Sequence, residues 1–205
     1  MTDELRPDIE TWALANGFEA STADITGATP LLRTGALDTT DDAYMGELDG
    51  RDAVLAEFSI GSPTAGQAFG GSGSSSTEFT LFLVAVDDSG WPRLTVHPVS
   101  FSEHSWTRRL LQRDHEINVS PEMDERYRVV AAHKVSDDDV RRLFTPDVVA
   151  WWLAQDPELF VDIEDHGEAG AYLAVAHPGL GLTDQQLDAL RDRAVHLAGL
   201  FDPVA

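Results

Sequence analysis

The sequence predicts an α+β fold built on a mainly antiparallel sheet, and three observations support this prediction. Several short segments alternate apolar and polar residues or are continuously apolar, as strands are. Turn signals join these segments as hairpins and meanders, without a regular alternation of strand and helix. Helix starts with capping residues stand apart from the strands. We therefore expect one domain over residues 1–205, with an N-terminal helix, two short mid-chain helices and a C-terminal helix.

The first half of the chain is expected to hold one helix and a hairpin. Residues 7–16 carry an apolar stripe at helical spacing, and Gly17 after them is a natural helix end. Asp49-Gly50 is a strong signal for a two-residue turn. The turn lies between two predicted strands, residues 41–48 and 53–60, and the apolar residues of the second strand alternate onto one face.

The middle of the chain alternates between a low-complexity loop and further strands. Residues 61–76 read GSPTAGQAFGGSGSSS and are expected to form a flexible loop. Residues 79–86 are almost wholly apolar, which predicts a central strand. The next strand, residues 94–99, contains Pro98, so we expect it to lie at an edge of the sheet or to end there. The remaining expected elements here are a short helix over residues 105–112 and strands over 116–119 and 127–132.

The helix starts in the second half are the clearest local signals. Ser136, Thr145 and Thr183 each precede a helix, and each is bracketed by an apolar pair that links the entry residue to the first turn. The helix that begins at Thr183 carries a single apolar face. Between the last two helices, residues 159–164 and 171–176 are expected to form a hairpin.

The charge of the chain narrows the classes of partner and chemistry. Asp and Glu number 36 against 14 Lys and Arg, for a formal net charge of −22. Such a field repels phosphate backbones and anionic lipids, so we expect neither a nucleic acid nor a membrane as a partner. Lys134 is the only lysine and cysteine is absent, which excludes a P-loop and thiol chemistry. The N-terminus has no apolar signal segment, so we expect a cytoplasmic protein. No cofactor fingerprint occurs, so we expect no cofactor.

One candidate metal site follows from the spacing of three residues. Asp162, Glu164 and His166 occupy alternate positions of a predicted strand, so all three could point to one face and hold a divalent ion. An ordinary solvated strand face would look the same, with Val161 and Ile163 in the core and His166 in the turn. A metal-dependent hydrolase or metal-binding enzyme is therefore an alternative hypothesis.

A second candidate site lies in a segment whose charge differs from the rest of the chain. Residues 101–134 hold six cations and six anions, so this segment is neutral. A docking site for an acidic ligand or a second copy of the protein would use Arg108, Arg109 and Arg113, with Trp106 as an apolar anchor. In the alternative, the arginines pair with carboxylates elsewhere in the fold.

The tryptophan pair Trp151-Trp152 is a third feature. Adjacent residues on a helix point about 100° apart, so both rarely enter the same core. One is expected to pack inside with Val148, and the other to cover a sheet edge or form an interface, which is compatible with a homodimer.

Three segments, MDERYRV (123–129), RLFTP (142–146) and WWL (151–153), resemble an uncharacterised family of bacterial proteins. The resemblance covers the second half of the chain. It implies a short acidic-to-aromatic strand before a proline-containing helix start, and an α+β domain of unknown function. It carries over no functional residue.

No nucleophile motif, acid–base pair or cofactor fingerprint occurs in the sequence. The leading interpretation is therefore a non-enzymatic cytoplasmic binding or protein-interaction domain, with a homodimer or another protein as its partner. It predicts no deep polar pocket with convergent titratable groups, and an apolar surface patch that involves the tryptophans. The metal-dependent enzyme and an anion-binding module are the two alternatives.

Overall fold

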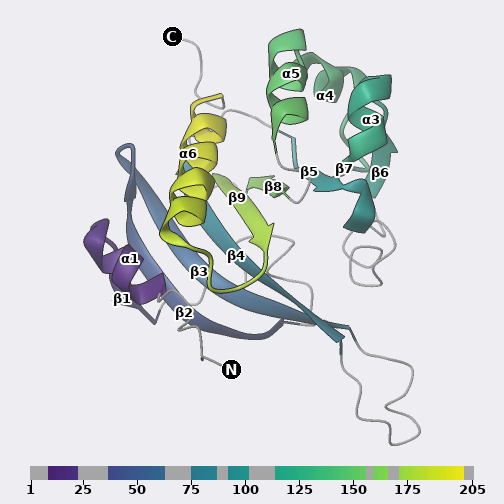
Figure 1. The fold of residues 1–205 in the computed structure, drawn as a ribbon. Coiled ribbons are helices and arrows are strands. Elements are labelled where there is room, and N and C mark those ends of the chain that lie inside the picture. The colour runs from purple at the N-terminus through teal and green to yellow at the C-terminus, as the bar shows by residue number, and fades with distance from the viewer. Residues whose placement is uncertain are drawn as a thin grey trace, which may run out of the picture.

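A computed structural model describes residues 9–22, 37–62, 75–86, 92–101, 114–155, 159–165 and 171–200. Within these ranges, one antiparallel sheet of nine strands is accompanied by five α-helices (Figure 1). The predicted combination of an antiparallel sheet with helices is confirmed. That residues 1–205 form a single domain remains a prediction.

The elements have the following bounds. The strands are β1 (Glu19–Ser21), β2 (Leu37–Leu48), β3 (Arg51–Ser62), β4 (Ser75–Val86), β5 (Leu94–Pro98), β6 (Asp114–Ile117), β7 (Tyr127–Ala132), β8 (Phe160–Asp165) and β9 (Ala171–Pro178). The helices are α1 (Ile9–Ala15), α3 (Pro121–Arg126), α4 (Asp137–Leu143), α5 (Pro146–Ala154) and α6 (Asp184–Leu200), and a 3-10 turn, η2, covers Val99–Phe101.

The strand order is β1-β2-β3-β4-β9-β8-β5-β7-β6. The first four strands form a meander, and the hairpin of β8 and β9 lies between β4 and β5, far from its place in the sequence. The predicted turn between β2 and β3 is confirmed: Asp49 and Gly50 have φ angles of 52° and 75°, as a turn with two left-handed residues requires. The predicted hairpin of β8 and β9 is also confirmed.

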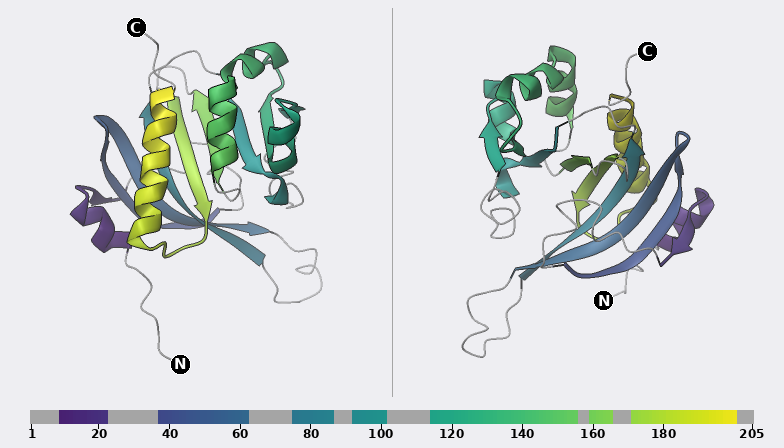
Figure 2. Two further views of the ribbon diagram at one scale, coloured as in Figure 1. Left: turned by 45° about the horizontal axis from the view of Figure 1, so that its top comes forward. Right: turned by 180° about the vertical axis from the view of Figure 1, so that it is seen from behind.

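Both faces of the central strands are buried. Buried residues of all five described helices join the larger core cluster on one face of the sheet, and α1 and α6 lie against that face in Figure 2. We call it the helix face. The opposite face carries a smaller cluster, which includes the four alternating residues predicted in β3 and their neighbours in β4: Val54, Ala56, Phe58, Ile60, Phe79, Leu81 and Leu83. Burial on both sides explains why residues 79–86 of β4 are almost continuously apolar.

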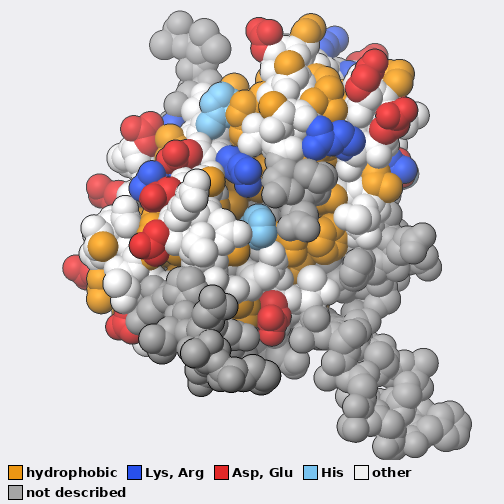
Figure 3. Space-filling model, in the orientation of Figure 1, with side chains coloured by type: hydrophobic (Ala, Val, Ile, Leu, Met, Phe, Trp, Pro, Cys, Tyr) orange, Lys and Arg blue, Asp and Glu red, His pale blue; other side chains and the backbone are white. Residues whose placement is uncertain are grey.

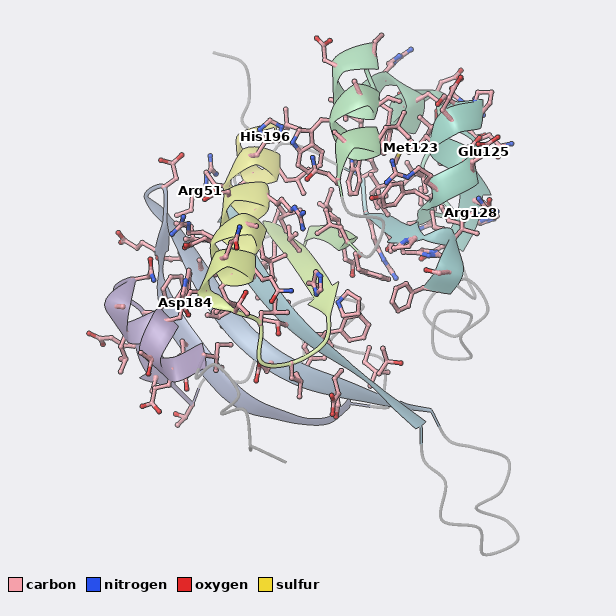
Figure 4. All side chains as sticks on the ribbon, in the orientation of Figure 1. Arg51, Met123, Glu125, Arg128, Asp184 and His196 are labelled. Atoms are coloured by element: carbon pink, nitrogen blue, oxygen red, sulfur yellow. The ribbon has the colours of Figure 1, made fainter. Side chains whose placement is uncertain are left out.

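Two local predictions need correction. The strand with Pro98 is internal, between β8 and β7, and proline is its last residue, so the strand-end alternative is right and the edge position is wrong. Residues 121–126 form a helix, α3, where the resemblance implied a strand. Ser120 caps α3 by accepting a hydrogen bond from Met123 N, and Met123 points inward while Glu125 points outward (Figure 4).

The three predicted helix starts are confirmed by their caps. Ser136 Oγ accepts from Asp139 N, and Thr145 Oγ1 accepts from Val148 N. Thr183 and Gln186 exchange hydrogen bonds in a capping box: Thr183 N donates to Gln186 Oε1 over 2.9 Å.

Most of the predicted glycine-rich loop and all of the predicted helix over residues 105–112 lie outside the described residues. Within the described ranges, no helix combines the length and apolarity that crossing a lipid bilayer requires.

The contact between Phe18 and β2 provides a test of the fold. A Cβ atom at Gly46 would lie 2.8 Å from Cγ of the buried Phe18 ring. We expect Gly46→Ala to lower the free energy of unfolding by about 1–3 kcal/mol because the ring must shift. Urea denaturation measures this change.

A matched control is Gly199→Ala in α6, where a Cβ meets no atom within 4 Å. This variant should be neutral or more stable by up to about 1 kcal/mol, because alanine favours the helix. Equal effects of the two substitutions would contradict the close packing of Phe18 on β2.

Candidate functional site

A partly enclosed apolar cavity of about 280 Å³ lies between the helix face of the sheet and helices α4, α5 and α6. Its floor consists of Leu94 and Val96 from β5 and Val161 and Ile163 from β8. The antiparallel register places Leu94 opposite Ile163 and Val96 opposite Val161, so the four side chains form one compact patch. All four are buried.

The walls of the cavity come from helices on either side of this floor. In Figures 1 and 2, α5 and α6 stand side by side above the sheet. Leu197 and Leu200 of α6 form one wall. The other wall is the end of α4 and the beginning of α5: Arg142, Leu143, Phe144, Thr145, Val148 and Trp152.

Large side chains join α5 to α6 beside the cavity. The rings of Trp151 and His196 are stacked, with centroids 4.8 Å apart and an interplanar angle of 18°. Figure 4 shows His196 near the end of α6, toward α5. Arg193 Nε also donates to Gln155 Oε1 over 3.1 Å. These contacts link the two helices that contribute opposite walls of the cavity.

The end of α5 is held from a further direction. The Arg126 guanidinium donates to the backbone oxygens of Leu153 and Gln155. These carbonyl groups belong to the last turn and the cap of α5, where a cation is favoured. The helix that forms one wall is therefore anchored by α3 as well as by α6.

The lining of the cavity is almost free of polar groups. Among the lining residues that the structure describes, Arg142 and Thr145 are polar, Trp152 carries an indole N–H, and none is Asp, Glu or His. Arg142 is 78% exposed and makes an ion pair with Asp139 over 3.2 Å. Figure 3 shows hydrophobic side chains gathered between α6 and α5. The described lining is therefore mainly apolar, as in sites that bind apolar molecules.

The structure buries Trp152 as expected for one tryptophan of the pair, whereas Trp151 packs at the border of the same core rather than over a sheet edge. Trp152 is 3% exposed and packs edge-on against Tyr127, with ring centroids 5.3 Å apart. Trp151 is half-buried and its ring stacks on His196. A role of either tryptophan in a protein interface remains a prediction.

The predicted anion-binding residues Trp106, Arg108, Arg109 and Arg113 lie outside the described residues, so that role also remains a prediction. Two other arginines of the neutral segment are described, and both have internal partners. Arg126 binds the end of α5. Arg128 Nε pairs with Glu116 over 3.0 Å, and the same guanidinium donates to Asp124 O.

Of the predicted metal ligands, the structure describes the side chain of Asp162 alone. Asp162 lies on the face opposite the helices, fully buried, and accepts a hydrogen bond from Thr95 Oγ1 over 2.9 Å. Val161 and Ile163 enter the helix-face core as predicted. A solvated strand face therefore does not describe the position of Asp162. The side chain of Glu164 and all of His166 lie outside the described residues.

Among the described side chains, no group of three His, Asp or Glu could hold a metal ion. The site with Asp162, Glu164 and His166 stays a prediction.

His97 lies in β5, two residues after Thr95, and is more deeply buried than the partly buried or surface position that an isolated histidine suggests. Its ring is 1% exposed and stacks on Phe160, with centroids 5.8 Å apart. His97 Nδ1 lies 3.0 Å from Pro98 O. A carbonyl oxygen can only accept, so Nδ1 carries the proton and the buried Nε2 is an acceptor without a hydrogen bond. Thr95 and His97 occupy alternate positions of β5, and every residue of this strand is buried, so both side chains enter a covered face of the sheet.

Burial sets the protonation of this histidine. Desolvation lowers the pKa of His97 below its ordinary value of 6.5, and the positive charge of Arg128 lowers it further. The hydrogen bond to Pro98 O opposes the shift. The ring is therefore neutral at neutral pH.

Comparisons of the chain with protein-family models, with curated proteins and with solved structures found no match. The function is therefore inferred from the chemistry of this chain.

The buried histidine makes stability depend on pH. Because the pKa of His97 is lower in the folded chain, the unfolded chain takes up a proton first as the pH falls below 6.5, and stability is lost there. When the pH falls from about 7.5 to about 5.5, the free energy of unfolding of the wild type should decrease. The decrease should be about 1 kcal/mol smaller in His97→Gln, which has no imidazole to protonate. Urea denaturation at both pH values measures the difference, and identical losses in the two proteins would contradict the neutral, buried ring.

Proposed function

We propose that this protein is a non-enzymatic binding domain that holds a small, largely apolar molecule in the cavity between α5 and α6. The observation that carries this proposal is the lining itself. Ten of the twelve residues around a space of about 280 Å³ are apolar, and none is a candidate general base or nucleophile in a suitable pair. Binding without chemistry is the function that such a surface supports.

The size of the cavity limits the size of its ligand. An engineered apolar cavity of about 150 Å³ binds benzene, so about 280 Å³ accommodates roughly eleven non-hydrogen atoms. For a ligand of that size, we expect a dissociation constant between about 10 µM and about 1 mM.

The site is organised before a ligand arrives. Its floor belongs to strands that pair on both edges near the middle of the sheet. Thr145 caps the beginning of α5, and Arg126 binds the end of α5. Little ordering entropy is therefore lost when a ligand enters, which favours binding to a cavity with few polar contacts.

The alternative functions have less support in the described part of the chain. Asp162 is buried against Thr95, and the two described arginines of the neutral segment have internal partners. A stoichiometric divalent metal in the purified protein would favour the metal-dependent enzyme. An interface through the half-buried Trp151 is compatible with the proposed cavity, because this ring lies beside it on α5.

Filling the cavity tests the proposal. Val148 lines the space, and Val148→Phe adds carbon atoms where the ligand would lie. We expect 1-octanol to bind the wild type and to bind this variant at least about tenfold more weakly, because several buried methylene contacts are lost. Titration calorimetry or ligand-observed NMR measures the affinities.

Ala150→Phe is the matched control, because Ala150 is exposed on the same helix and does not line the cavity. Its affinity for 1-octanol should equal that of the wild type. Absence of binding to the wild type at millimolar 1-octanol, or equal weakening by both substitutions, would refute the cavity as the site.

A further inference from the structure

We propose that the ligand is an amphipathic carboxylate, whose hydrocarbon part occupies the cavity and whose carboxylate lies at Arg142. This inference rests on the proposed binding function and adds the chemical class of the ligand. It follows from the position of Arg142, the single charged side chain among the described lining residues, which is largely exposed at the end of α4.

Arg142 has the chemistry to bind such a headgroup. A guanidinium group keeps its charge at every physiological pH and presents five N–H donors in a planar fork that matches a carboxylate. The described ion pair of Arg142 uses Nη1 and one oxygen of Asp139. Both partners are more than half exposed, at 78% and 61%, and such pairs contribute little to stability. A ligand carboxylate can therefore share or replace Asp139.

The beginning of α5 adds to the positive potential at the same place. Thr145, the N-cap of α5, is also a lining residue. The N-terminal end of a helix carries partial positive charge, which favours an anion nearby. Arg142 and the start of α5 are separated by only two residues, so both features act on the same side of the cavity.

The rest of the lining specifies the other part of the ligand. Valine, leucine, isoleucine and aromatic side chains make up the rest of the described lining, and apart from the indole N–H of Trp152 they carry no polar group. A molecule with one polar end and an unbranched hydrocarbon chain meets both conditions. Octanoate has ten non-hydrogen atoms, close to the roughly eleven that the volume allows.

The net charge of the protein disfavours binding of an anionic ligand. A formal net charge of −22 repels anions and attracts cations at long range. Asp139 in the first turn of α4 and Asp147 in the first turn of α5 also repel anions and attract cations. If the field of the whole protein decided the affinity, a cationic ligand would bind best, whereas a local site at Arg142 predicts the reverse order.

Three probes of equal chain length separate these possibilities: octanoate, 1-octanol and octylammonium. At low ionic strength, we expect octanoate to bind the full-length protein most tightly, then 1-octanol, then octylammonium, with about fivefold between successive probes. Added salt should reduce the differences between the probes, because it screens charges near the surface. Titration calorimetry measures all three affinities.

Arg142→Gln should abolish the preference for octanoate, so that octanoate binds this variant no more tightly than 1-octanol does. Arg141→Gln is the matched control, because Arg141 is the adjacent arginine of α4, pairs with Asp137 and Asp138, and does not line the cavity. This control variant should retain the preference for octanoate.

The outcomes distinguish this inference from the function on which it rests. Equal binding of octanoate and 1-octanol to the wild type, or a preference for octanoate that survives Arg142→Gln, would overturn the carboxylate and leave the apolar cavity intact. Tightest binding of octylammonium would also overturn it. If none of the three probes binds, or if Val148→Phe does not weaken their binding, the proposed function itself is wrong.

Discussion

The insertion of the β8–β9 hairpin between β4 and β5 is the constraint on which the rest of the structure depends. This pairing joins an N-terminal meander to the strands of the second half and gives one continuous sheet. Side chains of the hairpin, such as Val161 and Val175, enter the core of the helix face. The chain enters the hairpin after α5 and leaves it into α6, so these two helices lie on either side of it. The cavity is therefore a consequence of the strand order: its floor is β8 with its neighbour β5, and its walls are the helices that flank the hairpin in the sequence.

The two faces of the sheet bury different kinds of side chain. On the helix face, aromatic and aliphatic side chains pack against amphipathic helices, and one space between α5 and α6 stays unfilled. The opposite face buries polar groups next to an aromatic cluster, with Thr95 donating to Asp162 and a neutral His97 stacked on Phe160. None of the described lining residues of the cavity is acidic, although the chain has a formal net charge of −22. Among these residues, Arg142 carries the one charged side chain, and it is positive.

Features set by a few neighbouring residues were predictable. The caps at Ser136 and Thr145 and the turn at Asp49-Gly50 depend on hydrogen bonds and backbone angles within four residues, and all three were predicted. The helix α3 was missed although Ser120-Pro121 is a possible start. It has only six residues, and its inward-facing Met123 is fully buried in the core, so packing rather than propensity stabilises it. The burial of Asp162 was missed for a related reason, because alternation in a strand does not show whether the second face is covered.

The sequence by itself predicted the antiparallel pattern of strands and the helix starts. Its composition also gave the acidic charge and excluded thiol and P-loop chemistry. Only the tertiary structure decided which strands are neighbours, that Trp152 packs inside while Trp151 stacks on His196, and that residues 94–96, 142–152, 161–163 and 197–200 surround one cavity. The physical reason is the range of the interactions. Capping and turn formation act between residues close in the chain, whereas a cavity is the space left when distant elements pack, and its shape depends on all of them at once.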